Sequence, residues 1–165
     1  MTLHTHPTVT DDEADILAVI RRETATFAAS DFAAWEECWV KALHTTNVFS
    51  SEFSGVNALL GFDAIAANMR HVMENDLGCG VENYDLSNIT VTLRGDVAWV
   101  TFDCCSTYPS GQSADVFETR ILARSATGWK IAYSLSAVHC MGREAAFRVD
   151  QAGQVTWQSA DAEHG

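Results

Sequence analysis

One acidic side chain interrupts an apolar stripe near the N-terminus. The stripe recurs at helical spacing and consists of Ile16, Val19, Ile20 and Phe27. Glu23 falls on the same face, where a carboxylate is costly to bury without a partner. Its charged end therefore either reaches the rim of the fold or projects into a polar pocket as a general acid or base. In the second case Glu23 is a candidate catalytic residue for proton transfer.

The sequence offers no pattern for metal, nucleotide or nucleophilic chemistry. A glycine-rich phosphate loop and a Gly-x-Ser-x-Gly elbow are both absent, and the histidines are scattered. We therefore expect neither a metal nor a cofactor. The cysteines contain no CxxC pair, which favours free thiols in the core and a cytoplasmic protein; they are Cys38, Cys79, Cys104, Cys105 and Cys140.

Length and charge restrict the class of protein further. The chain has 165 residues, of which 47% are hydrophobic, enough for one core. Its formal net charge of −12 repels nucleic acid and anionic membranes, since both attract clusters of Lys and Arg. No run of eighteen apolar residues is present, so we expect no membrane partner.

Three helices must position Glu23 and its surroundings. Acidic residues after Thr10 predict a helix over 11–29. Asp31 is the expected N-cap of a second helix that ends in Trp39, with aromatic residues on one face. A third helix is expected to begin at Gly61 and to end near Gly78.

Strands dominate the second half of the chain. The pattern predicts a first strand over 44–50 and a loop over 51–61. Period-two alternation then predicts four strands joined by tight turns, and these should pair as an antiparallel meander: 82–93, 97–108, 115–124 and 129–138. Helices followed by such a meander predict an α+β fold.

The chain divides into three predicted parts. Residues 1–10 form a disordered leader, residues 11–140 form the folded domain, and residues 141–165 form a C-terminal tail. The tail contains a plausible hairpin over 147–149 and 155–157, which either extends the sheet, contacts a partner, or is a frayed remnant.

Alternation along the second meander strand predicts a dimer. If its smaller residues face the helices, Trp99 lies on the outer sheet surface, and a large exposed aromatic residue there suggests a homodimer contact. In the next strand, Glu118 and Arg120 are expected to pair across the same outer face.

The order of these elements resembles a known superfamily. The resemblance is based on four motifs: the helix ending in Trp39, Gly61-Phe62-Asp63-Ala64-Ile65, and two strand motifs at 95–100 and 128–132. This order is similar to that of SnoaL-like and ketosteroid-isomerase-like proteins of the nuclear transport factor two-like superfamily. The resemblance implies a cone-shaped half-barrel, with a curved antiparallel sheet wrapped around the three helices and a ligand in the cone. It also implies frequent dimers through the outer sheet face.

The resemblance also implies positions for a site. Asn47 stands where isomerase-like members carry a carboxylate base, and an amide cannot take a proton, so His44 or another group must substitute. Asp115 falls near the position of the acid that stabilises an oxyanion, and it could equally be a solvated turn residue. The helix-one tyrosine of those isomerases aligns with Glu23. The last-strand histidine common in SnoaL-like proteins is missing here.

The expected function is the binding of a small hydrophobic molecule, with acid–base isomerisation, dehydration or cyclisation as its chemistry. His44, Glu23 and Asp115 are the catalytic candidates. The ligand-binding candidates are Trp39, Asn47, Phe102, Tyr108 and Phe117. Aromatic residues at such spacings also form ordinary core. The alternative function is a non-catalytic ligand-binding or dimerisation module of the sensor kind.

Overall fold

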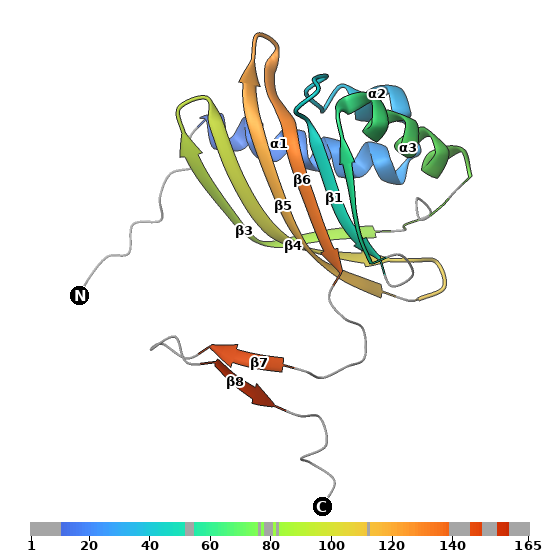
Figure 1. Ribbon diagram of the computed structural model, residues 1–165, viewed down its shortest axis with the longest axis vertical. Helices are drawn as coiled ribbons and strands as arrows, with labels where there is room; N and C mark the ends of the chain where they lie inside the picture. The colour runs from blue at the N-terminus through green and yellow to red at the C-terminus, as the bar shows by residue number, and fades with distance from the viewer. Residues whose placement is uncertain are drawn as a thin grey trace, which may run out of the picture.

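The structure is a computed structural model that describes residues 11–51, 55–75, 77, 81, 83–111, 113–138, 146–149 and 155–158. Figure 1 shows a curved, open sheet whose strands bend around the helices. The predicted α+β class and cone-shaped half-barrel are confirmed. The leader expected at residues 1–10 lies outside the described residues.

The first two helices begin as predicted. Helix α1 spans Asp11–Ala28 and carries acidic residues in its first turn, which suits the positive end of the helix dipole. Helix α2 spans Phe32–Glu36, and Asp31 Oδ1 accepts a hydrogen bond of 3.0 Å from the backbone of Ala34.

Helix α2 ends earlier than predicted. Strand β6, Gly128–Val138, captures the backbone on both sides of Trp39: Val40 N donates to Ile131 O, and Ile131 N donates to Cys38 O, each over 2.8 Å. Trp39 therefore lies in a short bridge with β6 rather than in the helix.

Helix α3 spans Phe62–Glu74 and follows a glycine that the turn requires. Gly61 has φ +83°, a conformation that residues with a side chain rarely adopt, and its N–H donates to Thr45 O over 2.8 Å. The apolar residues of α3 recur at helical spacing, and of these Ile65 is buried, whereas Met69 and Val72 are half-buried.

The predicted antiparallel meander is confirmed, and its strands are β3 Asn83–Arg94, β4 Val97–Thr107, β5 Ser113–Ser125 and β6. Strand β1, Thr46–Ser51, pairs in parallel with β6 and antiparallel with β2, Gly55–Leu60, so the sheet has the order β2-β1-β6-β5-β4-β3. Register shifts at Ser87/Thr90 and Ile121/Leu122 mark irregularities of the kind that bend a strand.

The predicted loop over 51–61 is wrong, because most of it is strand β2, Gly55–Leu60, paired antiparallel with β1. The strand lies at the edge of the sheet, and its exposed positions include the apolar residues Val56 and Leu60. Its sequence therefore lacks the alternation of apolar and polar residues that predicts a half-buried strand. Its glycines lie at its start and just beyond its end, where they do not interrupt the pairing.

Strand β4 separates the two faces of the sheet as predicted. Its inward residues are buried: Ala98, Val100, Phe102 and Cys104. Trp99 points away from them and is 57% exposed. The inner face therefore carries the core and the outer face carries a large exposed aromatic residue.

The predicted C-terminal hairpin is present as β7, Ala146–Val149, and β8, Val155–Gln158, which pair antiparallel. It forms a two-stranded sheet of its own, so of the alternatives for the tail, extension of the main sheet is not observed, and contact with a partner stays a prediction. None of the helices in the described part of the chain has the length and apolar character needed to cross a membrane.

Candidate functional site

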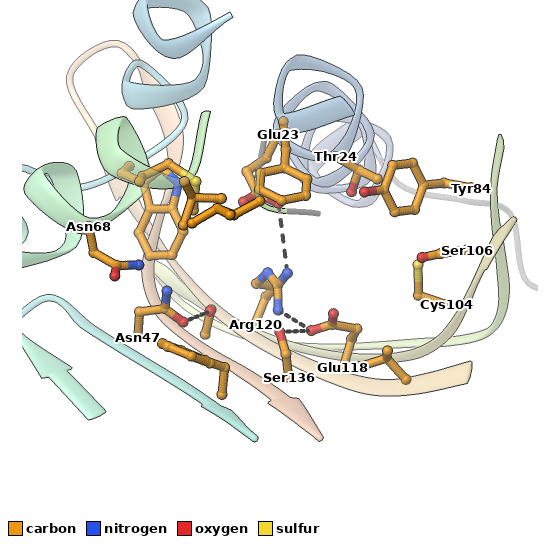
Figure 2. A pocket seen from close by; sticks show the side chains of 18 of the residues that line it. Glu23, Thr24, Asn47, Asn68, Tyr84, Cys104, Ser106, Glu118, Arg120 and Ser136 are labelled. Atoms are coloured by element: carbon orange, nitrogen blue, oxygen red, sulfur yellow. Dashed lines mark hydrogen bonds and ion pairs between the residues drawn. The ribbon is translucent and has the colours of Figure 1, made fainter. Parts of the chain in front are cut away.

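A cavity of about 460 Å³ lies between the inner face of the sheet and the helices (Figure 2). Side chains from α1, α3, β1, β4, β5 and β6 line it. Much of the wall is apolar and includes Phe27, Phe49, Met69, Val72, Phe102 and Val116. Such a wall, interrupted by a few polar groups, is typical of sites for small molecules.

A buried ion cluster lies at the centre of the cavity wall. Arg120 Nη1 donates to Glu118 Oε2 over 2.5 Å, and Ser136 Oγ donates to the same oxygen over 2.8 Å. Arg120 Nη2 lies 3.7 Å from Glu23 Oε2. The Arg120 guanidinium also lies 5.6 Å from the centre of the Phe102 ring. We call Glu23, Glu118 and Arg120 the buried cluster.

The register of the meander places Glu118 and Arg120 on the inner face of the sheet. Val100 pairs with Arg120 and Phe102 pairs with Glu118, and directly paired residues share one face of a sheet. Because Val100 and Phe102 face the helices, Glu118 and Arg120 do so as well. The expected position of this pair on the outer face is therefore wrong, although the two residues do contact each other.

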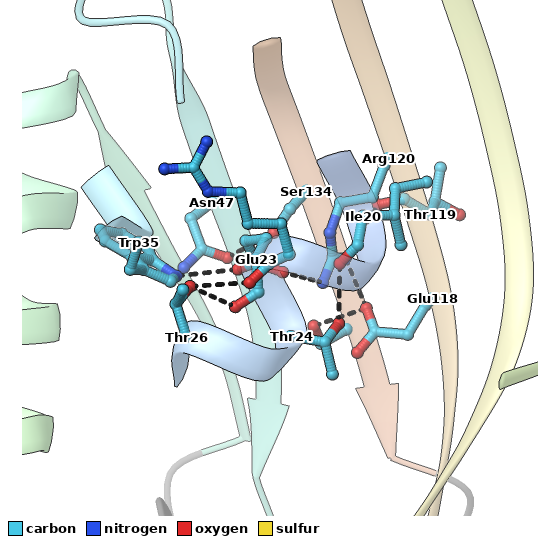
Figure 3. A network of polar contacts seen from close by, with 12 residues as sticks. Ile20, Glu23, Thr24, Thr26, Trp35, Asn47, Glu118, Thr119, Arg120 and Ser134 are labelled. Atoms are coloured by element: carbon cyan, nitrogen blue, oxygen red, sulfur yellow. Dashed lines mark hydrogen bonds and ion pairs between the residues drawn. The ribbon is translucent and has the colours of Figure 1, made fainter. Parts of the chain in front are cut away.

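Glu23 is held through one of its carboxylate oxygens, as Figure 3 shows. Trp35 Nε1 donates to Glu23 Oε1 over 2.9 Å, and the residue is only 7% exposed. Burial raises the pKa of Glu23, and the nearby Arg120 charge opposes that effect without cancelling it. The second oxygen, Oε2, has Arg120 at 3.7 Å, which is longer than a hydrogen bond.

The charges around Arg120 keep it protonated. Burial opposes its positive charge, but attraction to Glu118 and Glu23 raises its pKa overall. Its Nε atom is buried without a hydrogen-bond partner, and among the described residues Trp39 Nε1 is the other such side-chain atom. The cavity wall thus contains a cation and an indole donor that the protein itself does not fully satisfy.

An amide pair lies to one side of the buried cluster. Ser134 Oγ donates to Asn47 Oδ1 over 2.9 Å, and Asn47 is 8% exposed. Asn68 of helix α3 extends toward Asn47 from the opposite wall (Figure 2). Cys104 and Ser106 lie on the other side of Arg120.

The structure brings together five of the residues proposed from the sequence. The residues that line the cavity are Glu23, Trp39, Asn47, Phe102 and Tyr108. Glu23 is buried in the cavity wall, so of the two alternatives for this residue the structure supports the pocket and not the rim.

Three predicted site residues lie outside the cavity. His44 is exposed in the segment before β1. Cys104 pairs with Val116 on the inner face, so the adjacent Asp115 and Phe117 point outward and are both exposed. The expected pocket positions of His44, Asp115 and Phe117 are therefore wrong. For Asp115 the other possibility, a solvent-exposed residue, is the one observed.

Sequence reasoning missed several polar residues of the cavity wall, namely Asn68, Ser106, Glu118, Arg120, Ser134 and Ser136. A signal for Arg120 was present: a hairpin turn near Ser110 places it opposite Val100, a residue that the alternation of β4 assigns to the inner face. This signal was missed because the apolar Phe117, on the opposite face of the same strand, suggested that its own face was the inner one and that Glu118 and Arg120 faced outward.

The buried cluster can carry out acid–base chemistry, whereas the described thiols are poor nucleophiles. Burial raises the pKa of Cys38 and of Cys104 to about 11, so both remain protonated. Within the described ranges, no three His, Cys, Asp or Glu side chains gather as a metal site would require.

Comparison with known families matches residues 16–140 to the SnoaL-like domain, which is more than half of the chain. No curated protein sequence matches the chain.

Solved structures show the same fold at low sequence identity. A candidate dehydratase of the NTF2-like family from Streptomyces avermitilis has a TM-score of 0.63 and 17% identity, covering 81% of this chain and 99% of that chain. A candidate ketosteroid isomerase from Parabacteroides distasonis has a TM-score of 0.62 and 16% identity, covering 82% of this chain and 95% of that chain. An NTF2-like protein with a cystatin-like fold from Novosphingobium aromaticivorans has a TM-score of 0.59 and 22% identity, covering 82% and 86%. At these identities the likeness shows the fold alone.

Proposed function

The chain belongs to the SnoaL-like domain family, and from this premise we propose that its cavity binds a small, largely apolar molecule and moves a proton on it. The chemistry is acid–base catalysis by side chains of this chain, in the class of isomerisation, dehydration or cyclisation. Solved relatives of this fold include a candidate dehydratase and a candidate ketosteroid isomerase, which supports this class without selecting a member of it.

The observation that carries the proposal is the environment of Glu23. Trp35 holds Oε1, whereas among the described residues Oε2 has no partner closer than Arg120 at 3.7 Å. Burial raises the pKa of this carboxyl toward the pH range in which proton transfer in both directions is efficient. Glu23 thus combines a fixed orientation with one oxygen that is available for a proton.

The proposed step begins with Glu23 as a carboxylate. Oε2 takes a proton from a carbon next to a ligand carbonyl, and the C–H electron pair forms a carbon–carbon double bond. The carbonyl π electrons move onto its oxygen, which becomes an enolate. The positive charge of Arg120 stabilises this oxygen, the task expected of Asp115 from the sequence. In a ligand with a C=C bond next to the deprotonated carbon, the enolate extends over that bond. Glu23 then gives the proton to the far carbon of the bond, the carbonyl re-forms, and the double bond has moved, which completes an isomerisation.

Proton exchange tests this step without knowledge of the natural substrate. 2-Tetralone is a compact apolar ketone with acidic protons next to its carbonyl, and NMR in D2O follows their replacement by deuterium. We expect the wild-type protein to accelerate exchange above the buffer rate, and Glu23→Gln to lose at least about 100-fold of that acceleration, the usual contribution of a general base. Glu74→Gln, at an exposed glutamate of α3, is the matched control and should retain it.

Two results would overturn the proposed catalysis: no acceleration by the wild-type protein, or full acceleration by a folded Glu23→Gln variant. Circular dichroism of each variant establishes that it is folded before rates are compared.

A second candidate function is ligand binding without catalysis. It is favoured by the hydrogen bonds that already occupy the buried cluster: Glu118 Oε2 accepts from Arg120 and Ser136, and Glu23 Oε1 accepts from Trp35. A polar network in which most groups already have partners can serve structure alone. Binding of 2-tetralone without proton exchange would favour this alternative.

We also propose a cytoplasmic homodimer. The thiols of Cys38, Cys104 and Cys105 are free, which suits a reducing compartment. Val97, Trp99 and Phe117 are exposed on the outer sheet face, and an apolar surface of this kind supports the predicted contact with a second copy. Light scattering of wild-type protein and of Trp99→Lys measures the mass, and a monomeric wild-type protein would contradict the dimer.

A further inference from the structure

We propose that Asn47 and Asn68 form a subsite that recognises a neutral oxygen, a hydroxyl or carbonyl, on the bound molecule. The inference deepens the proposed function, and it rests on that function only in requiring that the cavity binds a small molecule. It assigns the ligand a second polar group, separate from the one that meets the buried cluster.

The first step of the argument is the fixed orientation of Asn47. Its Oδ1 accepts from Ser134 Oγ over 2.9 Å, which leaves Nδ2 as the donor on the cavity side. No described residue accepts a hydrogen bond from Nδ2, and Asn47 as a whole is only 8% exposed. Nδ2 is not among the buried unpartnered atoms of the described residues, so it is accessible from the cavity, where a ligand acceptor can take the place of water.

The second step is the position of Asn68. It projects from α3 across the cavity toward Asn47, and Figure 2 shows the two amides on the same side of Arg120. An amide offers both a donor and an acceptor. A hydroxyl group between the two side chains could therefore accept from Asn47 and donate to Asn68.

The third step concerns charge. Among the described residues that line the cavity, the Asp, Glu, Lys and Arg side chains are those of the buried cluster, and Arg120 is already paired with two carboxylates. His71 of α3 also lines the cavity, but it is exposed and its Nδ1 lies 3.1 Å from Asn75 Nδ2. An anionic group near the amides would lie close to Glu23 and Glu118. Neutral oxygen therefore fits this subsite better than carboxylate or phosphate.

Phenol and toluene are a suitable pair of probes, because they differ only in the replacement of a hydroxyl by a methyl group. Binding is followed by NMR through the side-chain amide signals of 15N-labelled protein. We expect phenol to shift the Asn47 and Asn68 signals and to bind more tightly than toluene, by about fivefold for one neutral hydrogen bond. Benzoate, which carries a negative charge, should bind more weakly than phenol.

Variants identify the residues responsible. Asn47→Leu and Asn68→Leu should each remove the preference for phenol over toluene while retaining toluene binding. Asn68 is half-buried, so its variant tests the subsite even if Asn47→Leu does not fold. Ser134→Ala should reduce the preference, because Ser134 orients Asn47. Asn83→Leu, at an exposed asparagine outside this cavity, is the control.

The subsite would be overturned if phenol did not bind, if it shifted neither amide, or if its preference over toluene survived in both leucine variants. These outcomes differ from failure of the proposed catalysis. If the wild-type protein prefers phenol over toluene but does not accelerate proton exchange of 2-tetralone, catalysis is rejected and the subsite stands. If it accelerates exchange but shows no preference for phenol, the subsite is rejected and catalysis stands.

Discussion

Strand β5 carries two arginines with the same arrangement of charges in different surroundings. Arg120 lies between Glu23 of α1 and Glu118, and Arg124 lies between Asp12 of α1 and Asp96. Each arginine also contacts an aromatic ring. The side chain of Arg120 is 8% exposed, and that of Arg124 is 38% exposed.

Solvent decides what each cluster does. Around Arg124 water and salt screen the charges, so the contacts with Asp12 and Asp96 fasten the start of α1 to the sheet only weakly. Around Arg120 little water is present to screen the charges, and burial raises the pKa of Glu23. The pKa of the partly exposed Asp12 is instead lowered, mainly by its hydrogen bond with Arg124. An arginine between two carboxylates therefore provides a surface contact near the end of the strand and a candidate catalytic group four residues earlier.

The largest expected effect is a loss of folding stability when Arg120, but not Arg124, is replaced. Arg120→Met leaves Glu23 and Glu118 buried without a positive charge, and it should lower the free energy of unfolding by about 3–5 kcal/mol in urea denaturation at pH 7. Arg124→Met is the matched control and should cost much less, because its partners remain in water. Equal losses in the two variants would refute the comparison.

A triple variant sharpens this prediction. If the loss in Arg120→Met comes from uncompensated charge, replacing Glu23 and Glu118 with glutamine in the same protein should recover a large part of it. A triple variant no more stable than Arg120→Met would assign the loss to packing against Phe102 instead.

The second effect is a dependence on pH. Because folding raises the pKa of Glu23, the folded state binds its proton more tightly, and stability falls as the pH rises from about 4.5 through the folded pKa. Glu23→Gln has no proton to lose, so it should gain stability relative to wild type as the pH rises from 5 to 9. Glu74→Gln should follow the wild-type profile. Parallel profiles for wild type and Glu23→Gln would show that folding leaves the Glu23 pKa unshifted.

The smallest effect belongs to Asp12 and has the opposite sign. The hydrogen bond from Arg124 lowers the pKa of Asp12, so its contribution is present above about pH 3.8 and is lost as the pH falls through the folded pKa. Asp12→Asn should therefore be slightly less stable than wild type at pH 7 and equal to it in strong acid. In 1 M salt, where screening acts over about 3 Å, the difference at pH 7 should shrink, whereas that of Arg120→Met should persist.

Local patterns predicted most of the framework. Period-two alternation and turn residues located the four meander strands, and the same alternation placed Val100 inside and Trp99 outside. The failures arose where pairing partners are distant in sequence: β2 is an exposed edge strand, and the backbone near Trp39 is captured by β6. Of the candidate site, Glu23 and Asn47 were found, while Asp115 and His44 were misplaced.

The sequence by itself determined which residues alternate, which turns connect them, and that Glu23 interrupts an apolar stripe. These are properties of neighbours along the chain, governed by backbone geometry and hydrophobicity. For Glu118 and Arg120 the sequence contained conflicting signals about the face of the strand, and the tertiary structure decided that they face inward and meet Glu23. A charged pair two residues apart on a strand is ordinarily solvated. Its burial here depends on the strand register, which turns the pair inward, and on a third charge, Glu23, from a helix about a hundred residues earlier in the chain.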